Sequence, residues 1–293
     1  SVSHNFYYLW TVKRIKMFTE EKITTFFRKQ SIIFKKNIFE FTSPKLMGIL
    51  NVTEDSFFDG GKYNNLDNAI LRAQSLIEQG ADIIDLGACS TRPGSTLVCA
   101  KDEISKIIPI LKVIRKQFPD VVISIDTVWS EVSRAVVAEG ADIINDISGG
   151  NFDHQMLKTI GELSIPYILT HNGEITKINQ YFSERIEALY EYGAKDIILD
   201  LGFGFGKTIE ENYLLLAKQK EFKIYNLPIL TGISRKSMIY KTLNTSPDKA
   251  LNGTTFLHAF ALQNGADILR VHDIEEAKQC IKLFNEYKKH LKQ

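Results

Sequence analysis

Gly140-Ala141-Asp142-Ile143-Ile144 is one of four related segments that decide the fold. The others are Gly80–Ile84, Gly193–Ile198 and Gly265–Leu269. Each follows an amphipathic stretch and places its glycine where a helix would end, because glycine tolerates the left-handed conformation common just after a helix. An apolar run without polar alternation comes next, as expected for a strand of a parallel sheet that is buried on both faces. A helix followed by a buried strand therefore recurs four times.

Four further apolar runs of strand length lie between these segments, so that the two kinds of run alternate. Together they predict eight strands near residues 46–51, 82–87, 121–126, 142–147, 166–171, 196–201, 228–233 and 267–272. Helical patterns separate many of them, near residues 66–79, 101–117, 130–139, 183–192, 249–264 and 274–289. Alternating strands and helices indicate a parallel sheet. Eight such units predict an α/β fold with one closed (βα)8 TIM barrel, assigned to residues 44–293.

The segment Gly202–Lys207, GFGFGK, raises an alternative fold, an open Rossmann-type sheet that binds a nucleotide. Its glycines lack the G-x-G-x-x-G spacing, and the following Gly206-Lys207-Thr208 lacks the upstream glycine of a phosphate-binding P-loop. A glycine-rich turn between a strand and a helix is a sufficient explanation. The barrel is therefore preferred.

Residues 1–43 are expected to form an N-terminal extension ahead of the barrel. Because the chain does not begin with Met and Met17 follows, residues 1–16 are expected to be an addition ahead of the native start. Residues 1–45 hold nine Lys and Arg against three acidic residues, although the net charge of the whole chain is only +1. A nucleic-acid partner would require this basic excess on a folded surface. We expect a solvated tail and no such partner.

The cysteines and the apolar runs bear on the compartment. Cys89, Cys99 and Cys280 form no C-x-x-C pair, which argues against a disulfide framework or a zinc site. The apolar run Phe6–Trp10 is too short for a secretory signal, and no uninterrupted apolar stretch is long enough to span a bilayer. A cytoplasmic protein without a membrane partner is expected.

Polar residues follow or end all eight predicted strands, at the end of a barrel where active sites lie. In chain order they are Asn51, then Asp85 with Thr91 and Arg92, Asp126, Asn145 with Asp146, His171, Asp200, Ser234-Arg235-Lys236, and Arg270 with His272. Any one of them could simply cap a helix. Eight polar strand ends together indicate a functional site.

These side chains suit two kinds of ligand group. Carboxylates and an amide below an apolar mouth can pair with the N–H donors of a flat nitrogen heterocycle, while Lys236 can meet a ring carbonyl or nitrogen. Arg92, Arg270 and His272 suit a phosphate or diphosphate. Mg²⁺ bridging diphosphate oxygens is expected, with Asn51 as a hard oxygen ligand. A ring pocket beside an anion pocket predicts group transfer with departure of phosphate.

Seven ordered blocks of the sequence resemble the dihydropteroate synthase family, over roughly residues 44–290. They are Met47–Thr53 with Asp55–Phe57 and Asp59–Gly61, Ser90–Gly94, Ser124–Thr127, Ile144–Ile147, Gly202–Lys207, Ser234–Ser237 and Arg270–Asp273. The resemblance implies a (βα)8 homodimer that condenses (7,8-dihydropterin-6-yl)methyl diphosphate with 4-aminobenzoate in folate biosynthesis and releases diphosphate. Sulfonamides would then compete for the aminobenzoate site.

The same resemblance implies a role for each motif residue. Catalytic roles fall on Asp126, Lys236, Arg270 and His272. The pterin would be held by Asp126, Asn145, Ile147, Asp200, Phe205, Gly232, Lys236 and Arg270. The diphosphate would be bound by Asn51, Thr91, Arg92, Arg270 and His272, with magnesium on Asn51. The 4-aminobenzoate pocket would be formed by Phe57, Thr91, Pro93, Phe205, Ser234 and Lys236.

The chain departs from the family pattern at a few positions. Glu54 and Leu201 stand where the family usually has proline, and Thr170–Gly173 replaces its Met-His-Met-Gln block. Loss of a pterin-packing methionine at Thr170 predicts weaker pterin affinity. Two alternatives stay open: a pterin-dependent methyltransferase that acts on a corrinoid protein, and a pterin-binding paralogue without turnover. The methyltransferase would not require the segments Asp55–Phe57 and Ser234–Lys236, both of which are present.

Overall fold

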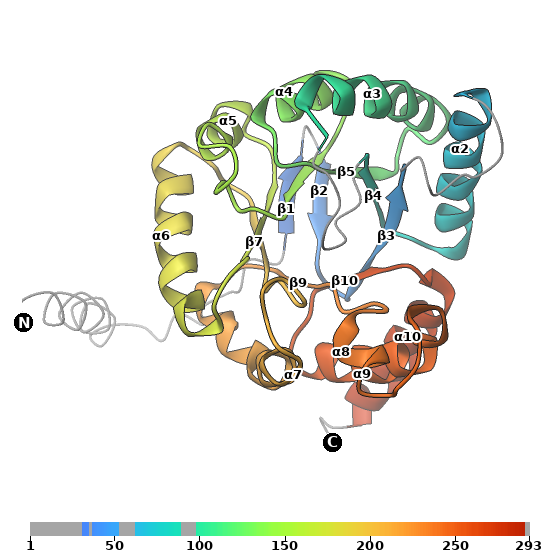
Figure 1. Ribbon diagram of the computed structural model, residues 1–293, viewed down its shortest axis with the longest axis vertical. Helices are drawn as coiled ribbons and strands as arrows, with labels where there is room; N and C mark the ends of the chain where they lie inside the picture. Colours follow the sequence, from blue (N-terminus) through green and yellow to red (C-terminus); the bar gives the residue numbers. More distant parts are fainter. Residues whose placement is uncertain (1–30, 35–36, 53–61, 89–97, 291–293) are drawn as a thin grey trace, which may run out of the picture.

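Eight parallel strands close into a barrel in the computed structural model, which describes residues 31–34, 37–52, 62–88 and 98–290. In chain order the strands are β3 (Lys45–Asn51), β4 (Ile83–Gly87), β5 (Val122–Asp126), β6 (Ile143–Asp146), β7 (Tyr167–Thr170), β8 (Ile197–Asp200), β9 (Ile229–Thr231) and β10 (Ile268–Val271). Each pairs with its neighbours in the sequence, and β10 pairs with β3 to close the ring (Figure 1). The predicted (βα)8 barrel is confirmed.

Helices surround the barrel as an outer ring (Figure 1). The longer ones are α2 (Lys62–Gln79), α3 (Ala100–Gln117), α4 (Ser130–Ala138), α5 (Met156–Leu163), α6 (Ile178–Glu191), α7 (Ile209–Lys218), α9 (Leu251–Gln263) and α10 (Ile274–His290). Shorter turns are η2 (Ile175–Lys177), η3 (Gln219–Tyr225), α8 (Ser237–Tyr240) and η4 (Pro247–Lys249). The sequence analysis did not place α5 or α7. Within the described part of the chain, no helix combines the length and the apolar character needed to cross a membrane.

The repeated Gly-Ala-Asp segments have a structural explanation. The glycines Gly80, Gly140, Gly193 and Gly265 have φ angles of +104°, +105°, +89° and +86°, as predicted for the left-handed residue after a helix. In three segments the aspartate accepts a hydrogen bond of 2.8 to 2.9 Å from a backbone N–H of the preceding strand. The pairs are Asp82 with Leu46, Asp142 with Ile123, and Asp267 with Ile229. The repeat therefore ties adjacent strands together at their amino ends.

The barrel interior changes from apolar to polar along the strands. At the amino ends, one cluster contains the inward-facing side chains of Met47, Ile83, Val122, Ile143, Ile168, Ile198, Leu230 and Ile268. Two positions further along, the strands carry Ile49, Asp85, Ser124, Asn145, Thr170, Asp200, Gly232 and Arg270. Because side chains alternate along a strand, this second layer also faces inward. The carboxyl end of the interior is therefore polar.

An antiparallel hairpin covers the amino end of the barrel. It consists of β1 (Ser31–Phe34) and β2 (Asn37–Glu40). Ile32 is fully buried in the apolar cluster of the barrel interior, and Phe39 and Phe41 pack against that cluster. Since the first layer of the barrel is entirely apolar, covering it removes apolar surface from water. The sequence analysis predicted no strand in this part of the extension, whose residues 1–30 lie outside the described residues.

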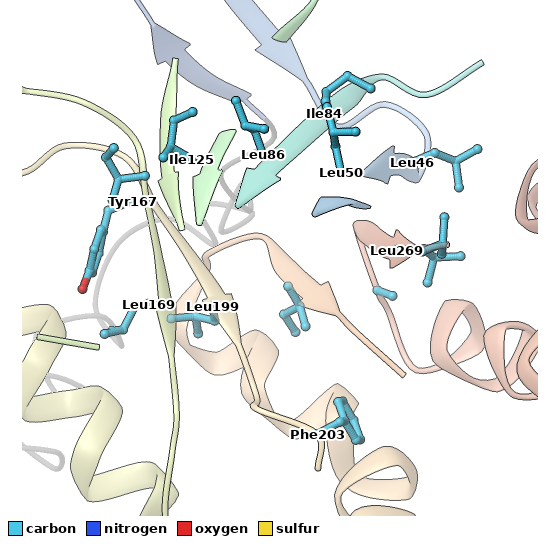
Figure 2. Close-up of a cluster of buried hydrophobic side chains, with 14 of the residues drawn as sticks. Leu46, Leu50, Ile84, Leu86, Ile125, Tyr167, Leu169, Leu199, Phe203 and Leu269 are labelled. Atoms are coloured by element: carbon cyan, nitrogen blue, oxygen red, sulfur yellow. The ribbon is translucent and has the colours of Figure 1, made fainter. Parts of the chain in front are cut away.

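A second apolar core lies between the strands and the helices. Figure 2 shows members of it, including Leu46, Ile84, Ile125, Leu169 and Leu269. These residues alternate with the inward-facing ones, so each strand is buried on both faces. This double burial explains why the strand sequences run apolar without polar alternation.

Candidate active site

Arg270 joins two carboxylates inside the carboxyl end of the barrel. Its Nε donates to Asp85 Oδ2 at 2.6 Å, and its Nη2 donates to Asp126 Oδ2 at 2.9 Å. Asn145 Nδ2 donates to the same Asp85 oxygen at 3.0 Å. Asp85, Asp126 and Asn145 are all buried. Side chains from β4, β5, β6 and β10 therefore form one connected polar network, as the sequence predicted for Asp126, Asn145 and Arg270.

Burial and neighbouring charges set the protonation of this network. Loss of water raises the pKa of Asp126 to about 7, with Arg270 opposing the rise and Asp85 adding to it. Burial alone would lower the pKa of Arg270, but Asp85 and Asp126 raise it above its usual value, so the guanidinium stays charged. One positive charge is thus shared between two carboxylates, and Asp126 titrates near neutral pH.

Lys236 and Asp200 lie close enough for their charges to influence each other, and an aromatic ring lies beside Lys236. The Lys236 ammonium donates to the Phe203 carbonyl and lies 4.6 Å from the centroid of the Phe205 ring. Burial lowers the pKa of Lys236 to about 8, against the opposing effect of Asp200. Burial likewise raises the pKa of Asp200, against Lys236. A carboxylate, an ammonium and an aromatic ring therefore come together here, as the sequence predicted for Asp200, Lys236 and Phe205.

The glycine-rich turn after β8 is held by Lys207. Its Nζ donates to the carbonyls of Gly202 at 2.8 Å, Phe205 at 3.2 Å and His171 at 3.3 Å. Thr208 caps α7, because its side chain accepts a hydrogen bond from the Glu211 N–H. The preferred interpretation, a turn between a strand and a helix, is confirmed. The sequence analysis did not identify the role of Lys207. Its three acceptors are backbone carbonyls, which every residue type has, so the sequence does not reveal them.

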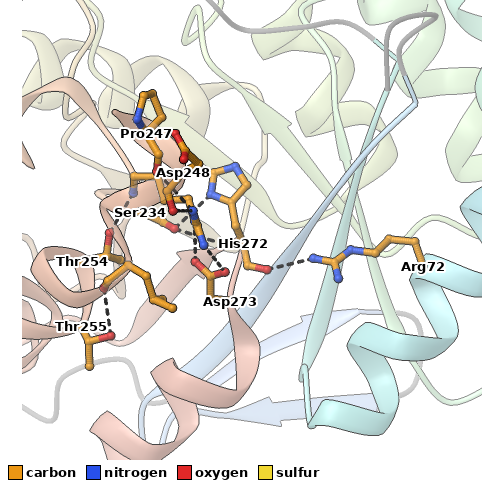
Figure 3. Close-up of polar contacts among 10 residues, drawn as sticks. Arg72, Ser234, Pro247, Asp248, Thr254, Thr255, His272 and Asp273 are labelled. Carbon is orange, nitrogen blue, oxygen red and sulfur yellow. Dashed lines mark hydrogen bonds and ion pairs between the residues drawn. The ribbon is translucent and has the colours of Figure 1, made fainter. Parts of the chain in front are cut away.

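Ser234 and His272 lie together at the ends of β9 and β10 (Figure 3). Ser234 Oγ is 3.0 Å from His272 Nδ1 and also accepts a hydrogen bond from the His272 N–H at 3.3 Å. Arg72 on α2 donates to the His272 carbonyl at 2.9 Å. Loss of water around the ring lowers the pKa of His272, and the positive charge of Arg270 lowers it further. The residue is exposed, so water offsets part of this effect, and the ring is expected to be neutral near pH 7.

Two polar strand-end residues, Asp146 and His171, do not join the site. Asp146 accepts hydrogen bonds from the Tyr167 hydroxyl at 2.7 Å and from two backbone N–H groups after β6. The His171 ring packs against Tyr181 of α6, with ring centroids 5.0 Å apart. Each directly follows an inward-facing residue and therefore faces outward. The expectation that the polar residues of all eight strand ends gather at one site is corrected for these two.

Four buried side-chain oxygens of the inward layer lack a hydrogen-bond partner among the described residues. They are Asp85 Oδ1, Ser124 Oγ, Asn145 Oδ1 and Thr170 Oγ1, from the consecutive strands β4 to β7. Buried polar atoms are almost always satisfied by protein, water or a ligand. This side of the barrel interior is therefore suited to a polar ligand or to ordered water.

Asn51 and Gly232 border the same region, and Ile147 follows Asn145 of β6 by two positions. A methyl group at Gly87 would lie 3.3 Å from Asp126 Cβ and 3.6 Å from Asn51 Oδ1, which places these two side chains around Gly87. A methyl group at Gly232 would meet nothing closer than Arg270 Cβ at 3.8 Å. Ile147 is half-buried just after β6.

The remaining predicted site residues lie outside the described residues: Phe57, Thr91, Arg92 and Pro93. Glu54, one of the departures from the family pattern, lies outside them as well. Within residues 31–34, 37–52, 62–88 and 98–290, no group of three or more His, Cys, Asp or Glu side chains could hold a metal ion.

Comparison with known proteins agrees with this geometry. Residues 47–272 match the family model described as pterin binding enzyme. Dihydropteroate synthase of Synechocystis sp. is 41% identical over 255 residues, which cover 81% of this chain and 88% of the relative. The family match includes residues from all eight barrel strands, and so every strand that contributes to the polar network.

Two solved structures show the same fold. Dihydropteroate synthase of Clostridium difficile, crystallised in the presence of pteroic acid, has a TM-score of 0.81 and 39% identity over 84% of this chain and 97% of its own. The Xanthomonas albilineans enzyme with 4-aminobenzoic acid has a TM-score of 0.84 and 32% identity over 88% of this chain and 98% of its own. The chain belongs to the pterin binding enzyme family and, within it, to the dihydropteroate synthases.

Proposed function

We propose that the carboxyl end of the barrel joins (7,8-dihydropterin-6-yl)methyl diphosphate to 4-aminobenzoate, giving 7,8-dihydropteroate and diphosphate. A C–N bond forms between the pterin methylene carbon and the amine, the C–O bond to diphosphate breaks, and the amine proton goes to water. The buried network of Asp85, Arg270, Asp126 and Asn145, with its unpaired oxygens, is the observation that carries this proposal. The ligands of the Clostridium difficile and Xanthomonas albilineans enzymes, pteroic acid and 4-aminobenzoic acid, support it.

The pterin ring is bound by Asp126, Asn145, Asp200 and Lys236. Ring N–H groups donate to the carboxylates and to the amide oxygen, while the Lys236 ammonium donates to a ring oxygen or nitrogen. Ile147, Phe205, Gly232 and Arg270 line the slot. The open space beside Gly232 supports this assignment, because a side chain at this position would take up space that the ring needs next to Arg270.

Diphosphate departs past Arg270 and His272. Arg270 stays charged because two carboxylates hold it, and a fixed cation stabilises the negative charge that grows on the leaving group. The neutral His272 ring can donate a hydrogen bond from Nε2 if Nδ1 accepts one from Ser234. Asn51, Thr91 and Arg92 complete the anion site.

Magnesium fits the donors at this end of the barrel. The side-chain oxygen of Asn51 is the kind of hard ligand that Mg²⁺ prefers, and Mg²⁺ commonly takes few protein ligands while phosphates and water fill the rest of its shell. When bound, the ion would neutralise charge on the diphosphate. Asn51 and the diphosphate oxygens would hold it.

Loss of diphosphate leaves positive charge on the pterin methylene carbon. Asp126 and Asp200 stabilise this charge as preorganised anions, and a weakly basic aromatic amine needs no strong base to attack. Phe57, Thr91, Pro93, Phe205, Ser234 and Lys236 form the 4-aminobenzoate pocket. Sulfonamides compete for that pocket.

A homodimer and a cytoplasmic location complete the proposal. Apolar side chains of α9 and α10 are exposed on the helical ring, among them Phe256, Phe260, Leu283 and Tyr287. An exposed patch of this kind is typical of a protein interface, and a second copy of the chain is its proposed occupant. Cys99 and Cys280 are both free thiols, which supports a reducing compartment.

The deciding experiment measures diphosphate release and dihydropteroate formation from the pterin diphosphate, with and without 4-aminobenzoate. The wild type should form dihydropteroate, and Lys236→Ala and Asp126→Ala should each lower kcat/KM by at least 100-fold, a loss equivalent to about 2.7 kcal/mol. Lys289→Ala, which removes an exposed lysine of α10, should leave activity unchanged. A folded wild type that forms no dihydropteroate rejects the proposal, and an unchanged kcat/KM rejects the role of the residue tested.

A further inference from the structure

Asp85 contacts two of the proposed pterin-binding residues through a single oxygen. Its Oδ2 accepts hydrogen bonds from Arg270 Nε at 2.6 Å and from Asn145 Nδ2 at 3.0 Å. The side chain is fully buried, and its other oxygen, Oδ1, has no partner among the described residues. The sequence places Asp85 among the polar strand-end residues, and the resemblance assigns it no role of its own. Its contacts show that it acts on the site through its neighbours.

The first neighbour is Asn145, whose amide can be oriented in two nearly isosteric ways. The amide NH₂ donates and the amide oxygen accepts, whereas an ionised carboxylate only accepts. Next to Asp85, the NH₂ group must face the carboxylate, because the reverse orientation would place two acceptors against each other. Asn145 Oδ1 then faces away from Asp85, where it is buried and unpaired in the described structure. By fixing this orientation, Asp85 makes Asn145 present its acceptor oxygen, Oδ1, to the ligand.

The second neighbour is Arg270, which is held at two of its three nitrogens. Nε is bound by Asp85 and Nη2 by Asp126. Two anchored nitrogens define the plane of a rigid, flat guanidinium. Without Asp85 the group would keep one anchor and could rotate about it. The plane that Arg270 presents to the ligand therefore depends on Asp85.

We infer that Asp85 is a positioning residue that makes the site selective for pterins whose ring edge donates hydrogen bonds, by fixing the Asn145 amide and the Arg270 plane. This inference rests on the proposed function of the site. It predicts that a 2-amino-4-oxo pterin binds better than its deaminated 2,4-dioxo analogue. The preference arises because Asn145 Oδ1 meets a ring N–H donor and would repel a ring oxygen.

The test compares the Kd of 6-hydroxymethylpterin with that of its 2,4-dioxo analogue by calorimetry. The wild type should prefer the pterin at least tenfold, and Asp85→Asn should reduce the preference to threefold or less, because two facing amides permit either orientation of Asn145. A merely structural loss would weaken both ligands equally and leave their ratio unchanged. An unchanged ratio in a folded Asp85→Asn variant overturns the inference.

Kinetics supply an independent measurement. Asp85→Asn should raise the KM for the pterin diphosphate about tenfold and leave the KM for 4-aminobenzoate within twofold. If Asp85 acts through Asn145, then Asn145→Ala should cost less in the Asp85→Asn background than in the wild type. Additive effects overturn the inference. Asp82→Asn, which alters a carboxylate at the opposite end of β4, should lower stability without changing either KM.

Three further outcomes distinguish a failure of the positioning role from a failure of the proposed function. If Asp85→Asn does not fold, Asn145→Ala alone must reduce the ligand preference to threefold or less, and an unchanged preference overturns the inference. If the wild type makes dihydropteroate but Asp85→Asn behaves like it, only the positioning role fails. If the wild type makes none, the proposed function itself fails, while the ligand-preference measurement still tests Asp85.

Discussion

Arg235 and Asp273 form a two-pronged ion pair, with Nε to Oδ2 and Nη2 to Oδ1 both at 2.8 Å. The pair connects the segments that follow β9 and β10. Arg235 lies between Ser234 and Lys236, and Asp273 directly follows His272, so three neighbouring positions of the site region depend on one contact. The φ angle of Arg235 is +55°, a left-handed conformation that bulky residues adopt only when their surroundings require it. Figure 3 shows Asp273 beside His272 and Ser234.

Removing this pair should damage both stability and activity. Arg235→Ala also removes hydrogen bonds to the carbonyls of Pro247 and Asp248, so the free energy of unfolding should fall by about 2 kcal/mol. The kcat/KM should fall at least tenfold as Ser234 and Lys236 lose their positions. Arg134→Ala, which breaks an ion pair between half-exposed side chains and a hydrogen bond to Thr159, is the matched control and should cost clearly less than Arg235→Ala. Chemical denaturation would contradict the prediction if both variants lost the same amount.

Gly202 should not tolerate a side chain, although another left-handed glycine should. A Cβ at Gly202 would lie 1.8 Å from the His171 carbonyl oxygen, whereas one at Gly193 would meet nothing within 4 Å. Both have positive φ angles, +69° and +89°. Gly193→Ala should therefore cost only the conformational strain, about 1 to 2 kcal/mol, and Gly202→Ala clearly more, with loss of activity. Comparable unfolding free energies for the two variants would show that the steric contact does not matter.

The pH dependence of kcat/KM should have a narrow maximum. It should rise as Asp126 ionises, with a pKa of about 7, and fall as Lys236 loses its proton, with a pKa of about 8. Asp126→Asn should remove the acid limb, and Lys236→Arg should move the alkaline limb to higher pH. A wild-type profile that is flat from pH 6 to 9 would be inconsistent with both assignments.

The contribution of Asp126 to the free energy of unfolding should fall as the pH rises, whereas kcat/KM rises as the same group ionises. The folded pKa, about 7, lies above the usual aspartate pKa of 3.8, so between these values the folded protein holds a proton that the unfolded chain releases. This contribution to stability is fully present below pH 3.8 and is lost as the pH rises through about 7. Asp126→Asn should therefore flatten the decline of the unfolding free energy over this range. Parallel wild-type and variant curves would rule the contribution out.

Thr170 offers a test of pterin affinity at the one strand end that departs most from the family pattern. Its hydroxyl is buried without a partner among the described residues, in register with Asp200 on the next strand. Thr170→Met should add apolar contact and lower the Kd for pterin about tenfold, equivalent to about 1.4 kcal/mol. Thr170→Val, which keeps the volume, serves as the control and should not tighten binding. Equal calorimetric affinities for wild type and Thr170→Met would disprove the idea.

Much of the fold could be predicted because its signals are local. The glycine after each helix and the apolar run after each glycine identify strands such as Ile143–Asp146 from neighbouring residues alone. The hairpin of β1 and β2 was not predicted, because most of the residues against which it packs lie elsewhere in the chain. Ile32 is buried in a cluster of strand residues, most of which are distant in sequence.

The candidate site divides in the same way. Polar residues at strand ends identified Asp126, Asn145, Asp200, Lys236 and Arg270 from the sequence. The sequence could not show which of these residues pair with each other, because partners such as Asp85 and Arg270 are 185 positions apart. The prediction that His171 joins the site was wrong, because His171 follows the inward-facing Thr170 and therefore faces α6.

By itself the sequence determined the eight βα units, the polar carboxyl end of the barrel and the family, since these depend on residue types and their spacing along the chain. Only the tertiary structure decided which polar side chains face inward, that Arg270 is shared by Asp85 and Asp126, and that Asp85 orients Asn145. The physical reason is that hydrogen bonds and the loss of water depend on distances between atoms, and closure of the barrel brings together strands that are far apart in the sequence.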